Sequence, residues 1–103
     1  MSHRTDTVPA MATTLTDRIR GCLLAGAIGD ALGAPVEFDT LTSIRSRFGP
    51  AGLTGYAPAY GRDGGAITDD TQMTLFTADG LLRARVAGAA ADTDTQVHRS
   101  YWR

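Results

Sequence analysis

Apolar residues recur at helical spacing in the first third of the chain. Ile19, Leu23, Ile28 and Leu32 follow the three-to-four-residue period of one helix face. Thr16 precedes most of this run and suits an N-terminal cap, because its hydroxyl can accept a backbone N–H of the first turn. The pattern therefore predicts a helix over residues 16–32.

A second apolar pattern, from Asp69 to Val86, covers two faces of a helix and predicts a helix that is buried on both. Gly88 is expected to end this helix. A linker over residues 89–94 then leads to a third helix that begins near Thr95. The first face carries Leu75, Ala78, Leu82 and Val86, and the second carries Met73, Phe76 and Gly80.

The segment from Pro35 to Gly65 holds three of the four prolines and many glycines, which predicts a long loop with one helical turn at residues 42–48. Long loops in compact domains are usually functional or disordered. Tyr56 and Tyr60 either pack this loop or flank an adenine or ribose, and packing is favoured. The expected fold is therefore all-α, with a long Gly/Pro-rich loop between the first two main helices.

The length of 103 residues and the hydrophobic content of 43% suit one small domain. Residues 1–14 show no helical period and are predicted to form a flexible extension, so the domain is assigned to residues 15–103. The single cysteine, Cys22, cannot form an intrachain disulfide. Within an apolar helical run it is expected to be a small buried side chain rather than a nucleophile.

Charge and hydropathy argue against two classes of partner. The net charge is −1 and the ten basic residues, all arginine, are scattered, so the clustered basic face of a nucleic-acid binder is absent. No stretch approaches the roughly 18 apolar residues of a membrane span, and the first residues lack the apolar core of a signal peptide. The expected location is the cytoplasm, with neither nucleic acid nor membrane as a partner.

Candidate chemistry begins at Thr68, Asp69 and Asp70, three oxygen-bearing side chains placed where a helix is about to start. Mg²⁺ prefers octahedral oxygen coordination and keeps several waters, so such a cluster can supply half of a metal site. The same residues also suit a plain helix N-terminus, with Thr68 as the cap and both aspartates against the positive end of the helix dipole. The residues alone leave both interpretations open.

Small residues recur every fourth position along the first predicted helix and form a smooth stripe. Each glycine costs about 1 kcal/mol of helix stability relative to alanine, so close packing is needed to compensate. A close helix–helix contact is the expected role of most of these glycines, and the approach of a ligand is the alternative. The stripe consists of Gly21, Ala25, Gly29 and Gly33.

Two further carboxylates follow this stripe closely. Glu37 is the only glutamate of the chain and comes just after Pro35, where the first helix must end. A short, rigid exit from a helix can aim one carboxylate into a cleft. Asp30 either reaches the same cleft or hydrogen-bonds to neighbouring backbone, and the structural role is favoured.

Two blocks of this sequence resemble the amino-terminal part of the ADP-ribosylglycohydrolase family. They are G-D-x-x-G-x-x-x-E, from Gly29 to Glu37, and T-D-D, from Thr68 to Asp70. The resemblance implies a multi-helix, all-helical domain, of which this chain covers only the amino-terminal portion. It also implies Mg²⁺-dependent hydrolysis, at a two-metal site, of the glycosidic bond that joins ADP-ribose to a protein side chain or a related conjugate.

The resemblance also implies roles for individual residues. Carried over position by position, Glu37 takes a catalytic or substrate-gating role, and Thr68, Asp69 and Asp70 coordinate metal. The partner implied is an ADP-ribosylated protein or an ADP-ribose conjugate. In the family, the second half of the metal centre comes from a D-x-D-T block near the carboxyl end.

Residues 92–95 spell D-x-D-T, but they follow an alanine-rich linker and come early, so a helix start capped by Asp94 or Thr95 is expected instead. The chain is therefore expected to be truncated, to hold half a metal centre, to self-associate through exposed apolar faces and not to turn over substrate alone. One alternative is a non-catalytic, crystallin-like relative or interaction module. Another is an unrelated helical domain in which Asp69 and Asp70 only cap a helix.

Overall fold

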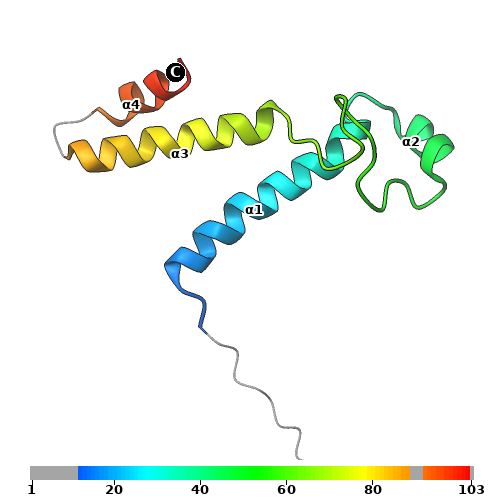
Figure 1. The fold of residues 1–103 in the computed structure, drawn as a ribbon, viewed down its shortest axis with the longest axis horizontal. Helices are drawn as coiled ribbons and strands as arrows, with labels where there is room; N and C mark the ends of the chain where they lie inside the picture. Colours follow the sequence, from blue (N-terminus) through cyan, green and yellow to red (C-terminus); the bar gives the residue numbers. More distant parts are fainter. Residues whose placement is uncertain (1–11, 89–91, 103) are drawn as a thin grey trace, which may run out of the picture.

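The computed structural model describes residues 12–88 and 92–102, and every regular element within them is a helix (Figure 1). The predicted all-α class is confirmed. Most of the predicted extension over residues 1–14 lies outside the described residues. The elements are α1 (Leu15–Gly33), a short 3-10 turn η1 (Ala34–Val36), α2 (Leu41–Phe48), α3 (Asp69–Ala87) and α4 (Thr93–Ser100).

The first helix starts earlier than its apolar pattern predicts. Its N-cap is Thr14, whose hydroxyl oxygen accepts the N–H of Asp17 at 3.1 Å, while the Asp17 carboxylate accepts the N–H of Thr14 at 3.1 Å. This reciprocal pair is a capping box, which satisfies two backbone donors at once. The prediction of Thr16 as the cap was therefore wrong, and Thr16 lies inside the first turn.

The other helix ends follow local rules. The predicted turn at residues 42–48 is present as α2, and Thr68 caps α3 by accepting the N–H of Asp70 at 3.2 Å. Gly88 ends α3 with a φ of +82°, as expected from a glycine stop. The N-cap position of α4 is Asp92, so the assignment of this cap to Asp94 or Thr95 was wrong. The Asp92 carboxylate accepts a hydrogen bond from the Thr95 hydroxyl.

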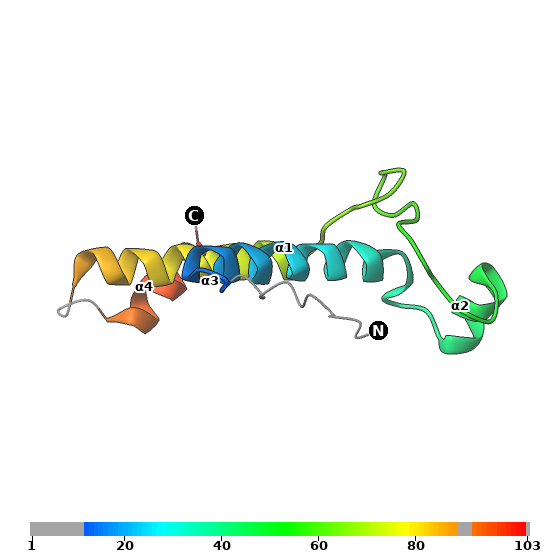
Figure 2. The same cartoon turned by 90° about the horizontal axis from the view of Figure 1, so that it is seen from below.

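The helices lie in one thin, open layer. α1 and α3 meet near Asp30 and Thr68 and then diverge, whereas α4 folds back along α3 and α2 lies apart with the long loop (Figures 1 and 2). The Cα radius of gyration is 20.1 Å, against about 13 Å for a compact domain of this length. Much apolar surface therefore stays open.

Only small apolar side chains are buried in the described part of the chain. Large ones are exposed even on the helix that was expected to be buried on two faces, with Val86 88% and Leu82 66% accessible. Cys22 is also exposed, so its expected burial was wrong; α1 touches the rest of the chain mainly at its C-terminal end. The buried apolar residues are Ala31, Ala34, Ala57, Ala66 and Ala84.

By length and composition alone, the segment Leu15–Val36 is able to cross a membrane, with 22 residues and a mean hydropathy of 1.3. The expectation that no stretch comes near this measure was wrong, because the alanines between the larger apolar residues raise the average. Core helices of soluble proteins pass the same test, so the measure does not assign α1 to a membrane.

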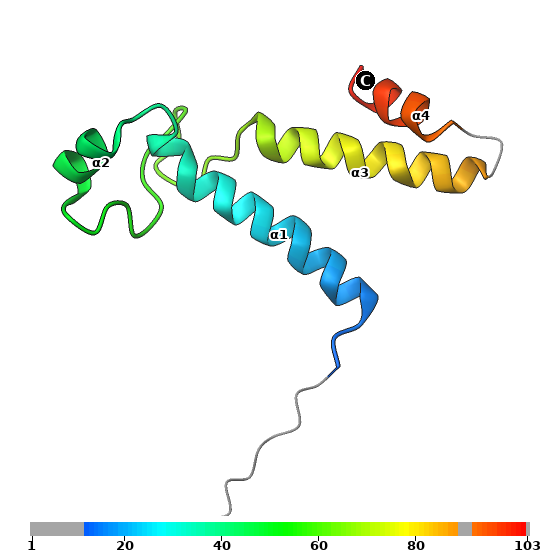
Figure 3. The same cartoon turned by 180° about the vertical axis from the view of Figure 1, so that it is seen from behind.

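The closest helix packing joins α3 and α4, which run side by side (Figure 3). Gly80 makes this approach possible, because a Cβ atom there would lie 2.4 Å from Cα of Val97. Around this contact, Ser100 Oγ donates to Asp79 Oδ2 at 2.8 Å and the Tyr101 hydroxyl donates to the carbonyl of Met73 at 3.0 Å. The α3–α4 hairpin is therefore fixed by one glycine and a few polar contacts.

We expect Gly80→Ala to destabilise the α3–α4 hairpin by about 1–3 kcal/mol, because the added methyl meets backbone that no side-chain rotation can move. Urea unfolding followed by the fluorescence of Trp102, the single tryptophan, measures the change. Gly21→Ala is the matched control: its methyl meets nothing within 4 Å, so up to about 1 kcal/mol of stabilisation is expected. Equal stability of Gly80→Ala and the parent chain would contradict the close packing.

Candidate functional site

The Asp30 carboxylate joins the C-terminal part of α1 to the first turn of α3. Its Oδ2 accepts the N–H of Thr68 at 2.8 Å, the N–H of Thr71 at 3.2 Å and the Thr71 hydroxyl at 2.6 Å. Its Oδ1 accepts the Thr68 hydroxyl at 2.6 Å. Both threonines are buried, at 9% exposure each. One carboxylate thus satisfies two backbone N–H groups and two hydroxyls at the start of α3, which is the structural role that the sequence favours.

These hydrogen bonds hold Asp30 in its charged form. Partial burial raises the pKa of this carboxyl group, but the two hydroxyls and two backbone N–H groups of Thr68 and Thr71 outweigh it and lower the pKa from 3.8 to about 2. Asp30 is therefore an ionised carboxylate throughout the neutral range. Both of its oxygens are already occupied by α3.

The candidate ligands Asp69 and Asp70 lie directly after this anchored threonine. Both are exposed, and within the described part of the chain neither carboxylate has a hydrogen-bond or ion-pair partner. Thr68 Oγ1 donates to Asp30 and accepts from the N–H of Asp70, which leaves one lone pair. The T-D-D block thus combines the cap that the plain interpretation predicts with two unpaired carboxylates.

Three residues of the glycine stripe of α1, Ala25, Gly29 and Gly33, form the floor of a cavity of about 390 Å³. Glu37 and Asp70 lie on its wall, so the structure brings a carboxylate of the first block together with one of the second. A Cβ atom at Gly21, Gly29 or Gly33 would meet nothing within 4 Å. The predicted helix–helix contact at the stripe was therefore wrong for the described residues, and the glycines are open to a ligand.

Glu37 leaves α1 through η1 and is held by the long loop. The Tyr60 hydroxyl donates a hydrogen bond to Glu37 Oε1. Tyr60 and Gly61 are the two central residues of a tight turn, both with positive φ, closed by hydrogen bonds between Ala59 and Arg62. The turn therefore carries the tyrosine back to the end of α1.

The pKa of Tyr60 shows the electrostatic character of this region. The hydrogen bond to Glu37 raises the pKa of the phenol, and so do some burial and the negative charges of Glu37, Asp69 and Asp30. The carboxylates of Glu37, Asp69 and Asp30 therefore give a negative potential at the Tyr60 phenol.

The predicted metal ligands could supply only part of the coordination shell of a metal ion. In the described residues no three His, Cys, Asp or Glu side chains come close enough to hold a metal ion. Asp69, Asp70 and the free lone pair of Thr68 are hard oxygen donors of the kind that Mg²⁺ takes, and Mg²⁺ completes its shell with waters and other groups. These side chains have the chemistry of magnesium ligands, and the magnesium site itself stays a prediction.

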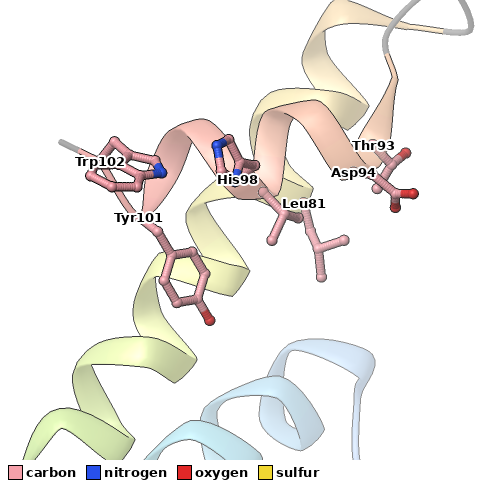
Figure 4. A pocket seen from close by; sticks show the side chains of 7 residues that line it. Leu81, Thr93, Asp94, His98, Tyr101 and Trp102 are labelled. Atoms are coloured by element: carbon pink, nitrogen blue, oxygen red, sulfur yellow. The ribbon is translucent and has the colours of Figure 1, made fainter.

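The D-x-D-T sequence at residues 92–95 does not join this site. Asp94 and Thr93 line a separate cavity of about 800 Å³ between α3 and α4, together with His98 and Trp102 (Figure 4). The Asp92 carboxylate is bonded to Thr95. Within the described chain, these residues start a helix, as expected.

Sequence reasoning missed two residues of the site. Thr71 carries the second hydroxyl to Asp30, and the signal was available: it follows Thr68 by three residues, which places both side chains on one helix face. Tyr60 was expected mainly to pack the loop. Its contact with Glu37 depends on a turn in which tyrosine is an unusual occupant, and no local signal marks it.

Comparison with known proteins places these features in a family. A family model described as ADP-ribosylglycohydrolase matches residues 11–103. The chain is 34% identical over 68 residues to an uncharacterized protein of Archaeoglobus fulgidus, covering 66% of this chain and 22% of that protein. It is 37% identical over 73 residues to the uncharacterized protein YegU of Escherichia coli K12, covering 65% of this chain and 22% of YegU. No solved structure gives a significant match.

We expect Asp30→Asn to lower the free energy of unfolding by about 1–3 kcal/mol, because the amide cannot accept all four hydrogen bonds. The pKa of Asp30 is lower in the folded chain than its ordinary 3.8, so its contribution is complete above pH 4 and disappears as the pH falls through about 2. Urea titrations at several pH values measure the difference between the two proteins.

The matched control for this substitution is Asp63→Asn, which removes an exposed loop carboxylate. Its unfolding free energy is expected to stay within about 0.5 kcal/mol of the parent. A deficit in Asp30→Asn that persists unchanged at pH 2 would contradict the ionised, hydrogen-bonded Asp30.

Proposed function

Because the chain belongs to the ADP-ribosylglycohydrolase family, we propose that it contributes to Mg²⁺-dependent hydrolysis of the glycosidic bond between ADP-ribose and a protein side chain or related conjugate. The observation that carries the proposal is the glycine-floored cavity with Glu37 and Asp70 on its wall. The chain spans 22% of the length of the relatives it matches, so the activity is proposed for a protein of family length.

The T-D-D block is the proposed metal-binding element. Asp69 and Asp70 offer two unpaired carboxylates, and Thr68, held by Asp30, keeps the start of α3 fixed beneath them. A bound Mg²⁺ would supply positive charge that orients the ribose hydroxyls and offsets the negative potential of the site.

Glu37 is the proposed catalytic carboxylate. Cleavage of a glycosidic bond passes through a transition state with oxocarbenium character and needs a water activated on one face of the sugar. A carboxylate on the cavity wall can accept a proton from that water or hold it in position. The absence of side chains from the glycine floor leaves room for the sugar between Glu37 and Asp70.

The chain alone is proposed to be inactive. The described residues supply at most three oxygen-bearing side chains toward a magnesium shell, and no third carboxylate or imidazole among them completes the cluster. A family of two-metal hydrolases needs ligands from both halves of its centre, as the sequence resemblance implies. We therefore propose metal and ADP-ribose binding, rather than turnover, as the property to test in this chain.

We expect isothermal titration to detect weak binding of Mg²⁺, and of ADP-ribose once Mg²⁺ is present. Asp69→Ala/Asp70→Ala is expected to abolish both, because it removes both unpaired carboxylates. Asp63→Ala is the matched control, with one exposed carboxylate lost from the loop and unchanged binding expected. A folded parent chain that binds neither probe would contradict this proposal for the chain alone and would indicate a truncated or non-catalytic piece.

Glu37→Gln separates the catalytic role from the metal role. We expect its Mg²⁺ affinity to stay within about twofold of the parent, because Glu37 is assigned to water and sugar rather than to the metal. Titration of Mg²⁺ into the variant, with circular dichroism as a check of helix content, measures this. Loss of Mg²⁺ binding similar to that of the double aspartate variant would instead make Glu37 a ligand.

A further inference from the structure

We propose that Tyr60 is a positioning residue for Glu37, and that it orients the carboxylate over the cavity. The proposal deepens the proposed function and rests on it. Glu37 lies at the end of α1, where it is exposed and η1 is only three residues long. A glutamate side chain in this place has several rotamers, so a partner is needed to keep it in one.

The hydrogen bond decides which oxygen stays available. The Tyr60 hydroxyl donates to Oε1 of Glu37, and the Glu37 carboxylate has no other hydrogen bond or ion pair with the described residues. The second oxygen, Oε2, is therefore left for a water or a sugar hydroxyl in the cavity. A tyrosine is suited to this task because its ring is rigid and its hydroxyl donates at a fixed distance from the backbone.

The backbone of Tyr60 supports a role beyond packing. It is the one non-glycine residue with a positive φ in the described chain, at +49°. A left-handed conformation costs a non-glycine residue free energy, and such positions persist where the surrounding structure requires them. The residue Tyr60 is 61% exposed, so burial does not explain why a tyrosine stands in this turn. The hydrogen bond to Glu37 gives a reason for a tyrosine at this position.

The test uses the fact that Glu37 is the only glutamate in the chain. Selective ¹³C labelling of glutamate gives one side-chain carboxyl signal, and this signal reports the surroundings of Glu37 directly. The variant is Tyr60→Phe, which removes only the hydroxyl. Tyr56→Phe is the matched control in the same loop, because the Tyr56 hydroxyl has no partner among the described residues.

We expect Tyr60→Phe to move the Glu37 carboxyl signal by more than its linewidth and to weaken ADP-ribose binding in Mg²⁺ about tenfold, since a hydrogen bond to a charged group is worth about that factor or more. Its Mg²⁺ affinity and helix content should match the parent. Tyr56→Phe should change none of these quantities. A merely structural role of Tyr60 would alter helix content or Mg²⁺ affinity together with ADP-ribose binding.

Two results would overturn the proposal. One is a Glu37 signal that Tyr60→Phe leaves unchanged in a folded chain. The other is a moved signal with unchanged ADP-ribose affinity, which would show a contact without a positioning role. If the parent chain binds no ADP-ribose, the proposed function fails and the positioning role fails with it, while the carboxyl signal still shows whether Tyr60 holds Glu37.

Discussion

The four hydrogen bonds to Asp30 are the constraint on which the rest of this structure depends. They join α1 to the first turn of α3 across 38 to 41 residues of sequence, and between these helices the chain buries no large apolar side chain. A carboxylate that accepts this many donors is held in its charged form, so the junction persists at neutral pH. The position of Asp69 and Asp70 relative to the glycine stripe follows from this junction. A hydrophobic contact of the same size would fix the angle between the helices less strictly, because it has no directional preference.

The open glycine stripe is explained by the same junction. Because α3 meets α1 near Asp30 and then diverges, the glycines of the stripe have no helix against them, and Ala25, Gly29 and Gly33 form the floor of the cavity beside Glu37 and Asp70. Each glycine weakens α1 as a helix, and no close packing in the described chain compensates for that loss. Access to the α1 backbone is what these glycines provide. The proposed function uses this access, since a sugar placed on the floor reaches both walls of the cavity.

Local sequence rules predicted the elements well and the tertiary contacts poorly. The helix periods, the Thr68 cap and the Gly88 stop each depend on a few neighbouring residues, and they were predictable for that reason. The prediction of a helix–helix contact at the glycine stripe was wrong because close packing and ligand access leave the same pattern in a sequence. The hydrogen bond of Tyr60 to Glu37 was not predicted because it spans 23 residues and depends on a turn that tyrosine rarely occupies. The resemblance to the family supplied an expectation that periodicity could not, namely that Glu37 and the T-D-D block belong to one site; in the structure Glu37 and Asp70 line the same cavity.

The balance of charge around the cavity gives a further reason to connect this site with a cation. The negative charges of Glu37, Asp69 and Asp30 all raise the pKa of Tyr60, so all three act on the same phenol. The carboxylate of Asp30 accepts four hydrogen bonds and that of Glu37 accepts one. The carboxylates of Asp69 and Asp70 have no hydrogen-bond or ion-pair partner in the described chain. The ion pairs of the described residues, Arg47 with Asp39 and Arg83 with Asp79, involve none of these four carboxylates. Unpaired carboxylates are suitable ligands for a divalent cation, and hard oxygens favour Mg²⁺ over softer metals. Because Asp30 holds Thr68 and Thr71, the proposed metal site can use the carboxylates of Asp69 and Asp70, which no other contact in the described chain occupies.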